Sequence, residues 1–482
     1  MTDSLSETPP AAPAPERDLD IVVFGATGFV GRLIAGHLSR HAPAQVRIGL
    51  AGRDLHRVDA VKAELADRAV YWKTLHADSS DAASLAQMAQ RTKVVISTVG
   101  PYAQYGLPLV QACAEAGTDY VDLCGETLFV RDSIDAYDEI ATAHGARIVH
   151  ACGFDSIPSD LGVFATWRQV KKDVAGDLST TTLYVTSLKG GLSGGTIASM
   201  VGQVDAAKEQ PKLRGVLADP YALSPDRDNE PEPRRGAETS QTQADGASTT
   251  DAEPSQNTGA GQQPNSDAGL SPVQRVEGAA KLAFGALGKA AGKVAQSRSR
   301  LTPDAQIGEF TAPFIMGPFN SQVVRRSNAL MSWSYGRDFR YRELVATGNS
   351  SAAPLRAAAL SAAMPAAAAG FAFGPTRALL ERVVTKPGEG PDEASRKEGR
   401  FTMTIHADTT SGAHYVTTVS AQVDPGYDGT AVMIGEAALA LVLDELALPR
   451  RHGVLTPATA FGDVLIERLT AQGFSFEVTR QN

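Results

Sequence analysis

Three glycines spaced three residues apart, Gly25, Gly28 and Gly31, follow the apolar run IVVF at residues 21–24. This spacing suits a strand that turns tightly into a helix. The first glycine permits the turn, the second lets the backbone approach a bound group, and the third lets the helix pack on the strand. Free N–H groups at a helix start attract negative charge, so the turn is suited to a pyrophosphate. The residues expected to bind a dinucleotide are Gly25, Ala26, Thr27, Gly28, Phe29, Val30 and Gly31.

A second apolar run, at residues 46–51, ends beside Arg53. Sites specific for NAD usually carry an acid at this place for the ribose hydroxyls. A guanidinium instead pairs with a 2′-phosphate through charge-assisted hydrogen bonds, each contributing about 1.5–3 kcal/mol. Arg53 therefore predicts NADPH as the cofactor, although Asp54 follows directly and a solvated loop arginine is the alternative. Asp78, at the end of the next expected strand, is predicted to approach the adenine.

The segment VVISTVGP, at residues 94–101, is typical of a fully buried strand that ends in a glycine turn. In sheets of this kind the nicotinamide lies near the carboxyl edge of the strands. The residues predicted to border it are Thr98, Val99, Gly100 and Pro101.

The elements that must position these residues alternate between strands and helices over residues 18–160. Such alternation predicts an α/β fold, with a Rossmann doubly wound parallel sheet that binds NADP. Residues 161–223 and 301–445 contain polar segments with strand periodicity, which predict an α+β substrate domain with a mixed or antiparallel sheet. A helix and a strand are expected within residues 446–482, with packing back on the Rossmann domain as one option.

The chain has 482 residues, 43% of them hydrophobic, and a formal charge of −9. Nine acidic residues and three arginines fall within residues 226–267, so most of this charge belongs to one segment. The near-neutral remainder lacks the basic footprint that nucleic acid requires. Three cysteines without CxxC or Cys/His spacing indicate a reducing compartment, and they predict neither a disulfide framework nor a metal site.

Four segments stand outside the alternating pattern. Residues 1–17 lack the basic and apolar regions of a signal peptide, and they are expected to form a disordered leader. Residues 224–269 contain no large apolar residue, which predicts a disordered acidic insertion over 224–272. Residues 273–300 have one apolar and one basic helical face, which suits an anionic membrane or a partner; packing on the second domain is the alternative. The charge-free, alanine-rich residues 357–376 favour a core or interfacial helical hairpin over a membrane span.

The motifs around these sites are GATGFVG, LAGR, TVGPYAQYGLPLVQACAEAGTDYVDLCGE, ACGFDSIPSD, SGGT, PFNSQVVRRSNAL, YGRDFRY and GVLTPATAFGDVLIERL. Through them nearly the whole chain resembles the saccharopine dehydrogenase-like oxidoreductases, and within these the mycobacterial trans-acting enoyl reductases. The resemblance implies a Rossmann domain, a mixed-sheet second domain and reduction of an enoyl double bond in a polyketide or lipid acyl chain, such as the phthiocerol class. It also implies a partner, a polyketide synthase without its own reducing domain that holds the acyl chain.

Enoyl reduction adds a hydride to the β-carbon of an unsaturated thioester, places negative charge on the thioester oxygen and protonates the α-carbon. The backbone amides at residues 193–196 or the Ser156 hydroxyl are candidates for the oxygen, and Tyr102 and Tyr105 are candidates for the proton. For each of them, a turn or a packing residue is the alternative. The residues predicted on the substrate side are Gly125, Glu126, Phe154, Asp155, Ser193, Gly194, Gly195 and Thr196.

Other residues of reactive types are expected to have structural or docking roles. Asp155 and Asp160 are expected to cap or hold the following helix, and Cys124 and Cys152 to be buried cysteines without a catalytic role. A basic and aromatic cluster is the candidate docking surface for an acidic carrier protein, with a solvated strand face as the alternative. The cluster comprises Arg325, Arg326, Trp333, Tyr335, Arg337, Phe339, Arg340, Tyr341 and Arg342.

Two other functions stay open on the sequence alone. One is a saccharopine-type amino-acid dehydrogenase, which needs basic residues around a polar pocket. The other is a non-catalytic NADP-binding scaffold at a membrane, suggested by residues 273–300 and 357–376.

We expect a cytoplasmic location, with peripheral contact at the inner face of the plasma membrane as an option. A homo-oligomer is compatible with such folds, but no feature of the sequence indicates one.

Overall fold

The computed structural model describes residues 17–65, 67–190, 194–227, 230, 302–372 and 390–481. The predicted leader except Arg17, most of the acidic insertion and the predicted basic helix at residues 273–300 lie outside these residues. So do Ser193 and the last four residues of the alanine-rich run. The chain forms two compact units: Met1–Glu230, Met316–Leu344 and Thr385–Asn482 make the first, and Pro231–Ile315 and Val345–Val384 make the second.

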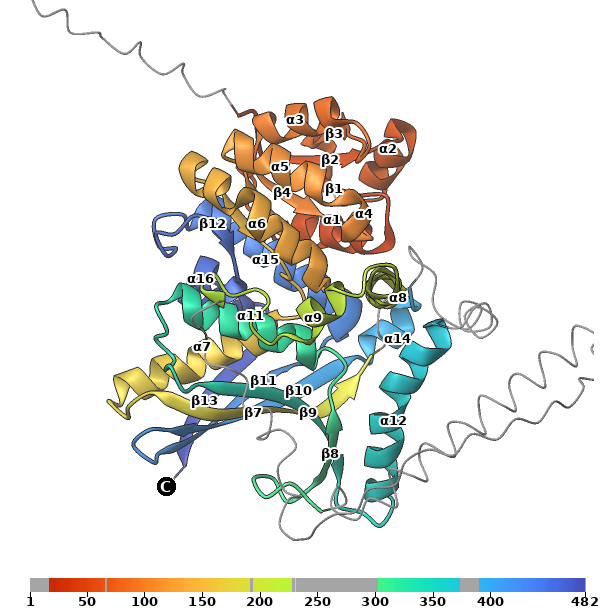
Figure 1. Cartoon of the computed structure of the whole chain (residues 1–482). Helices are drawn as coiled ribbons and strands as arrows, with labels where there is room; N and C mark the ends of the chain where they lie inside the picture. Colours follow the sequence, from red (N-terminus) through yellow and green to blue (C-terminus); the bar gives the residue numbers. More distant parts are fainter. Residues whose placement is uncertain are drawn as a thin grey trace, which may run out of the picture. The chain divides into compact units, whose positions relative to one another are not determined.

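A seven-stranded parallel sheet lies in the first unit, with the strand order β12-β6-β5-β4-β1-β2-β3 (Figure 1). Its central strands are completely buried, as expected for apolar runs covered on both faces. The strand order reverses between β4 and β1, which is where such sheets bind their ligands. The Rossmann prediction is confirmed. The strands are β1 (Leu19–Phe24), β2 (Ile48–Gly52), β3 (Lys73–His76), β4 (Thr92–Ser97), β5 (Asp119–Asp122), β6 (Arg147–Val149) and β12 (Gly453–Leu455).

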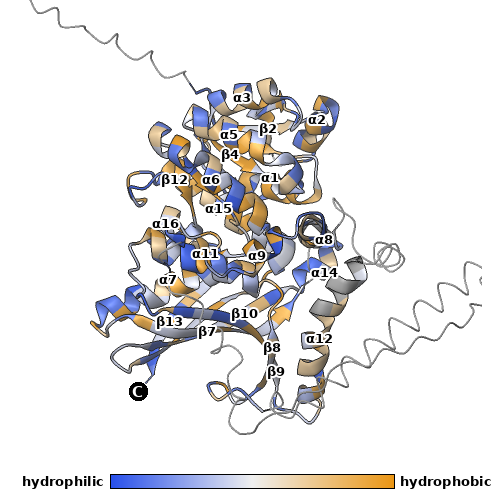
Figure 2. Ribbon diagram, viewed as in Figure 1, coloured by the Kyte–Doolittle hydropathy of each residue, from blue (hydrophilic) through white to orange (hydrophobic). Residues whose placement is uncertain are grey.

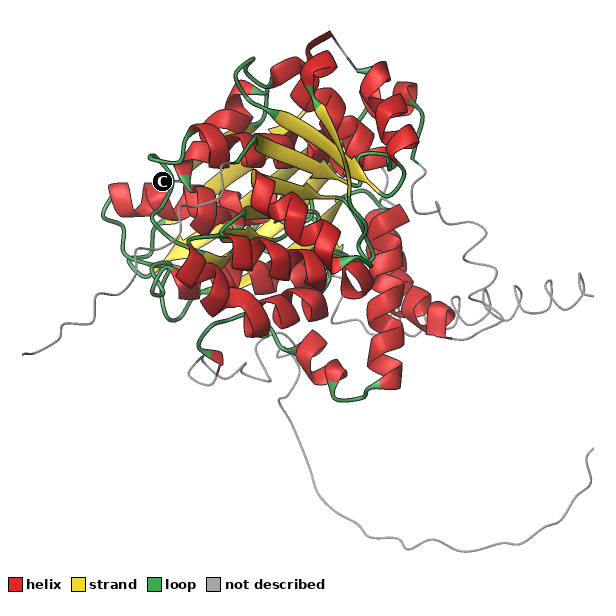
Figure 3. Cartoon of the chain, turned by 90° about the horizontal axis from the view of Figure 1, so that it is seen from above, coloured by secondary structure: helices red, strands yellow, loops and turns green. Residues whose placement is uncertain are grey.

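Helices cover both faces of this sheet, as the view from above in Figure 3 shows. On one face α1 packs against α15, and α15 contacts β1, β4 and β5. On the other face α5 packs between α3 and α6. These helices are α1 (Phe29–His41), α3 (Ala82–Arg91), α5 (Leu107–Ala116), α6 (Thr127–His144) and α15 (Thr430–Leu443); α2 (Leu55–Glu64), the short α4 (Tyr102–Tyr105) and the 3-10 helix η1 (Asp67–Tyr71) connect the strands.

A second sheet has the order β13-β11-β10-β7-β9-β8 and is antiparallel at β7, β10, β11 and β13, which agrees with the predicted second sheet. Buried and partly exposed residues alternate strictly along β10 and β11, so one face packs on α7 and the other meets solvent. The edge strand β13 is mostly polar and exposed (Figure 2). The strands are β7 (Leu178–Lys189), β8 (Phe310–Pro313), β9 (Arg340–Gly348), β10 (Arg400–Thr409), β11 (His414–Ala421) and β13 (Ser475–Gln481), and α7 is Ile157–Lys172.

In the second unit, the end of β9 lies beside β8 and α12. Thr347 Oγ1 donates hydrogen bonds to the Phe310 carbonyl at 2.9 Å and to the Ala353 carbonyl at 3.2 Å. The alanine-rich run forms a single helix through residue 372 rather than a hairpin, and its Leu355 is 70% exposed. The remaining helices of the chain are α8 (Gly194–Glu209), α9 (Leu213–Ala218), α11 (Gly317–Leu330), α12 (Ala353–Ala372), α14 (Glu393–Lys397), the π-helix η4 (Pro425–Gly429), α16 (Pro457–Phe461) and α17 (Asp463–Ala471).

Among the described residues, one helical stretch, Pro425–Leu443, is long and apolar enough to cross a membrane. Its mean hydropathy is 1.3, and 72% of it is buried inside the protein. Because it contains α15, which packs on α1 and the parallel sheet, its apolar composition is explained by core packing.

A buried ionic network ties this helix to its neighbours. Glu436 of α15, 3% exposed, accepts from His37 Nε2 of α1 at 3.0 Å and pairs with Arg468 Nε of α17 at 3.2 Å. A carboxylate at such a position is stable only while its partners are present.

We expect Glu436→Ala to lower the free energy of unfolding by about 3 kcal/mol, because it leaves the buried His37 imidazole without its acceptor and removes one of the two carboxylates that pair with Arg468. Lys397→Ala is the control, since Lys397 and Glu393 form an exposed pair with side chains 72% and 70% exposed, and such pairs contribute below about 1 kcal/mol. Urea unfolding followed by circular dichroism measures both. Equal losses of unfolding free energy in the two variants would show that the buried network stabilises the fold no more than an exposed ion pair does.

Candidate cofactor and active site

The glycine turn between β1 and α1 leaves room for a ligand at one position and none at the other two. Gly25 has φ +88°, and a Cβ there would lie 2.5 Å from Thr98 Oγ1. A Cβ at Gly31 would overlap the Gly25 carbonyl oxygen. At Gly28 a Cβ would meet only that oxygen, at 3.3 Å, so its other sides are open. The geometry fits the three separate roles inferred from the spacing.

Helix α1 starts at this turn with its amides uncapped. Gly28 is extended, with φ −74° and ψ 164°, and among the described residues no side chain caps the helix. The first turn of α1 also contains no acidic residue. The N–H groups of that turn can therefore donate to an anion, and a pyrophosphate satisfies them.

The two charged residues after β2 have different surroundings. Asp54 caps α2, since its carboxylate accepts from Arg57 N at 3.2 Å. Arg53 is exposed directly after the strand. Asp54 is therefore engaged with its own helix, while the guanidinium of Arg53 can reach a ligand at the strand end.

Asp78 lies in a turn after β3. Its carboxylate accepts from Ser80 N at 2.9 Å and from Ser80 Oγ at 2.8 Å, and these bonds lower the pKa of Asp78. The anion is thus held in place at the end of the strand, and its contact with the adenine stays a prediction.

The loop after β4 is joined to the glycine turn and to the loop after β5. Thr98 Oγ1 donates to the carbonyl oxygens of Phe24 at 3.1 Å and Gly25 at 3.2 Å. Glu126 accepts from Tyr102 N at 3.0 Å and from Ala103 N at 2.8 Å. The Glu126 carboxylate, placed on the substrate side by the sequence, therefore holds the start of α4 and is 2% exposed.

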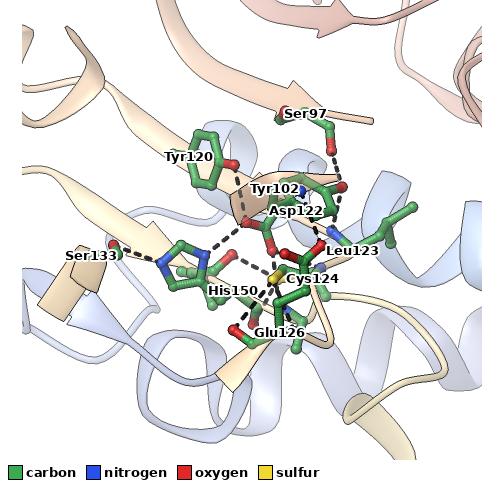
Figure 4. A network of polar contacts seen from close by, with 12 residues as sticks. Ser97, Tyr102, Tyr120, Asp122, Leu123, Cys124, Glu126, Ser133 and His150 are labelled. Atoms are coloured by element: carbon green, nitrogen blue, oxygen red, sulfur yellow. Dashed lines mark hydrogen bonds and ion pairs between the residues drawn. The ribbon is translucent and has the colours of Figure 1, made fainter. Parts of the chain in front are cut away.

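The two tyrosines predicted to deliver a proton differ in their environment. Tyr102 is 5% exposed; its hydroxyl donates to the Ser97 carbonyl at 3.0 Å and accepts from Leu123 N at 3.2 Å (Figure 4). Burial, with the nearby Asp122 carboxylate, raises the pKa of Tyr102. This geometry matches the packing alternative for Tyr102. Tyr105 is 41% exposed and keeps its candidate role.

Beneath this edge, Ser133, His150 and Asp122 are connected like a catalytic triad. His150 Nε2 lies 2.8 Å from Ser133 Oγ, and His150 Nδ1 lies 2.7 Å from Asp122 Oδ2 (Figure 4). Asp122 also accepts from Tyr120 Oη at 3.0 Å and from Cys124 N at 3.0 Å. Ser133 and Asp122 are 0% exposed, so no substrate reaches the hydroxyl. A nucleophile must be accessible, and we therefore assign this network to the core.

The prediction of buried cysteines is confirmed. Cys113, Cys124 and Cys152 are free and buried, and burial raises the pKa of each thiol. Among the residues that the structure describes, no group of three or more His, Cys, Asp or Glu side chains is placed to hold a metal ion.

The loop after β6 is held on both sides of Asp155. Phe154 N donates to Thr430 Oγ1 at 3.1 Å, and Ser156 Oγ donates to Asn320 Oδ1 at 2.9 Å. Ser156 is 0% exposed, which leaves its hydroxyl committed to Asn320. The sequence contained one signal that Asn320 contributes to this site, namely the polar residues in the otherwise packed helix α11. No local pattern indicated that Thr430 contacts the loop after β6.

Of the two expected roles for Asp155 and Asp160, capping α7 is not observed, since no side chain in the described part of the chain caps this helix; Asp160 instead has the other role and holds the helix. It accepts from Ser327 Oγ of α11 at 2.5 Å and from Ala458 N of α16 at 2.8 Å. Its carboxylate therefore joins three helices in the core.

The glycine loop predicted at residues 193–196 is largely the first turn of α8, and Ser193 lies outside the described residues. Helix α8 is attached to the loop after β5. Ser199 Oγ donates to Glu126 Oε1 at 2.7 Å, and Gln203 Oε1 accepts from Thr127 N at 3.0 Å. The backbone of Gly194, Gly195 and Thr196 thus belongs to a helix that is fixed to the substrate-side loop.

The predicted docking cluster is divided between the interior and the surface. Arg326 is 2% exposed and donates to the carbonyls of Leu223 at 2.6 Å and Val454 at 2.5 Å. The aromatic residues at 335, 339 and 341 are buried as well. A continuous basic and aromatic surface was thus a wrong expectation, because α11 is buried along most of its length and the aromatic side chains that follow it pack into the core. Arg337, stacked 3.5 Å from the Trp333 ring centroid, is exposed with Arg340 and Arg342.

The sheet order and the uncapped glycine turn define a Rossmann-type oxidoreductase domain. The saccharopine dehydrogenase NADP binding domain matches residues 21–149, so the cofactor is NADP(H). The glycine turn fits a dinucleotide, because Gly28 leaves open space at the uncapped start of α1. A Cβ at this position would enter that space.

Two relatives extend the comparison over nearly the whole chain, and one solved structure aligns with it more distantly. A Mycobacterium tuberculosis protein, provisionally named a trans-acting enoyl reductase, is 44% identical over 97% of this chain and 99% of its own. The Mycobacterium ulcerans trans-acting enoyl reductase is 40% identical over 96% and 99%. The L-glutamate-forming saccharopine dehydrogenase of Saccharomyces cerevisiae aligns over 96% of this chain and 100% of its own, with 13% identity and a TM-score of 0.47. The chain belongs to the saccharopine dehydrogenase-like family, with the trans-acting enoyl reductases, and is an NAD(P)H-dependent oxidoreductase.

Gly28→Ala and Gly31→Ala separate cofactor binding from folding. We expect Gly28→Ala to weaken NADPH binding about tenfold or more with little change in stability, because the methyl group points at the pyrophosphate position. Gly31→Ala should lower the free energy of unfolding by about 1–3 kcal/mol, because the methyl group overlaps the Gly25 carbonyl oxygen in the turn after β1. NADPH fluorescence titration and urea unfolding measure the two effects. Tight NADPH binding by Gly28→Ala would remove the turn from the cofactor site.

Arg53→Glu should weaken NADPH binding by about 10- to 100-fold and leave NADH binding nearly unchanged, because only NADPH carries the 2′-phosphate. Arg57→Glu is the matched control, since Arg57 is an exposed arginine four residues along the chain. Calorimetric titration with both cofactors measures the ratio. Equal weakening of NADPH and NADH would show that Arg53 does not contact the 2′-phosphate.

Proposed function

We propose that the protein uses NADPH to reduce the carbon–carbon double bond of an α,β-unsaturated acyl chain, delivered in trans by a carrier protein of a polyketide synthase. The observation that carries the proposal is the chemistry of the carboxyl edge of the parallel sheet. The loops after β4, β5 and β6, at residues 98–102, 123–127 and 150–156, contain no Lys or Arg, and their one histidine, His150, is buried and bonded to Asp122 and Ser133. A dicarboxylate amino acid needs cations at this edge, whereas an acyl thioester does not.

The relatives support enoyl reduction as well, because two proteins that match over almost their full length carry the name trans-acting enoyl reductase. The saccharopine-type alternative is supported by the domain family at residues 21–149 alone. Dinucleotide binding is shared by many reactions, so this match does not select the substrate.

When bound, NADPH supplies the hydride that adds to the β-carbon. The chain must then stabilise the negative charge on the thioester oxygen. Because Ser156 is committed to Asn320, we assign this role to the backbone amides at the start of α8. Ser199 and Gln203 hold this helix against the loop at residues 125–127, which keeps the amides in a fixed place.

Delivery in trans requires a surface for the carrier. The exposed arginines Arg337, Arg340 and Arg342 are the remaining candidates from the predicted cluster, and they suit an acidic carrier protein.

We also propose a cytoplasmic location with peripheral contact at the plasma membrane. The membrane contact is inferred from residues 273–300, which lie outside the described residues.

The decisive assay follows NADPH absorbance with three substrates: an enoyl thioester on a carrier protein, the same acyl group on a short free thiol, and saccharopine with NADP⁺. We expect oxidation of NADPH with both thioesters, a lower KM for the carrier-bound form, and no reaction with saccharopine. Turnover of saccharopine would establish the amino-acid dehydrogenase instead. NADPH binding without turnover of any substrate would favour the non-catalytic scaffold.

A further inference from the structure

Asp155 lies between two anchored residues at the carboxyl edge of the parallel sheet. On one side Phe154 is held by Thr430 Oγ1, and its ring centroid lies 5.0 Å from that of Phe401. On the other side the Ser156 hydroxyl is held by Asn320. The backbone of Asp155 is therefore fixed from α15, β10 and α11 at once.

The carboxylate of Asp155 has no side-chain partner in the described ranges. The residue is partly exposed, and its own backbone N–H is the hydrogen-bond donor to the carboxylate. It faces Gly125 of the loop after β5: a Cβ on Gly125 would lie 3.9 Å from Asp155 Oδ1 and 3.4 Å from Met316 Cε. An acidic group with a fixed backbone, a carboxylate without side-chain partners and a glycine opposite has the geometry of a group that meets a ligand.

Two other carboxyls with similarly raised pKa values show the contrast. Asp160 accepts from Ser327 and Ala458, and Glu343 accepts from Tyr341 Oη at 2.7 Å and Asn320 Nδ2 at 2.9 Å. Both are buried, and internal hydrogen bonds occupy their oxygens. Burial raises the pKa of all three to about 7, but Asp155 is the one of the three that is partly exposed.

The charges that face Asp155 favour its protonated form. Desolvation is the larger cause of its raised pKa, and the Asp122 carboxylate of β5 adds to it. The Cys124 thiol also faces it from the loop after β5 and has a raised pKa, so it is neutral at pH 7. The neighbouring groups from α15 and from the segment before α11 carry no charge: Thr430 bonds to the adjacent Phe154 N, and Met316 borders Gly125.

We propose that Asp155 is the catalytic acid that protonates the α-carbon, an assignment that rests on the proposed enoyl reduction. As hydride bonds to the β-carbon, the π pair of the double bond moves toward the α-carbon and the thioester oxygen. The Asp155 O–H bond then breaks and its proton forms the new C–H bond at the α-carbon. The resulting carboxylate regains a proton from water before the next turnover.

The test compares Asp155→Asn, Asp155→Glu and the control Glu343→Gln in the full-length protein. Asp155→Asn should bind NADPH as the wild type does and lower kcat by about 100-fold or more, the range of general acid catalysis. The wild-type kcat should fall as the pH rises through about 7, because the protonated form is the active one. Asp155→Glu should keep that pH dependence at reduced rate, and Asp155→Asn should lose it.

A readout independent of turnover is the infrared carboxylic-acid band. In pH-difference spectra, the wild type minus Asp155→Asn should show one carboxyl that titrates near pH 7, whereas Glu343→Gln should remove a different one without lowering kcat comparably. Unchanged kcat and pH profile in Asp155→Asn, with an active wild type, overturn the role of Asp155 alone. A wild type inactive on every enoyl thioester overturns the proposed function itself. Should Asp155→Asn not fold, the wild-type and Asp155→Glu pH profiles decide.

Discussion

The close approach of α1 to β1 is the constraint on which the rest of the structure depends. Gly31 sits where any Cβ would overlap the Gly25 carbonyl oxygen, so the helix lies directly on the strand end. Thr98 uses the same carbonyl to join the loop after β4 to the turn. On its far side α1 carries His37, whose bond to Glu436 brings in α15. One steric requirement thus places the glycine turn, the loop after β4 and the C-terminal core together.

Four carboxylates at or beneath the carboxyl edge have roles that follow from their partners. Glu126 accepts backbone amides and shapes α4, Asp122 joins His150 in the core, and Asp160 links three helices. Each is tied by hydrogen bonds that a substrate cannot displace cheaply. Asp155 has a raised pKa and, among the described residues, no hydrogen-bond donor beyond its own backbone N–H. The four carboxylates at this edge thus differ in how far the rest of the fold engages them.

The alternation of short apolar strands and helices predicted the parallel sheet because strand and helix periods are local properties of the chain. The spacing of the glycines predicted the turn for the same reason. Sequence reasoning failed where one element meets another. It expected an exposed basic cluster around Arg326, which the fold buries against carbonyl oxygens. It also gave Tyr102 and Ser156 candidate catalytic roles before their partners were known.

The sequence by itself determined the Rossmann class, the dinucleotide turn, the preference for NADP(H) and the family, since each rests on contiguous residues with a fixed local geometry. Tertiary structure alone decided which side chains are free to act. Asn320 and Thr430 reach the loop after β6 from 164 and 276 residues away, and they hold the neighbours of Asp155 without holding its carboxylate. Burial and hydrogen-bond partners depend on such long-range contacts, and no local pattern encodes them.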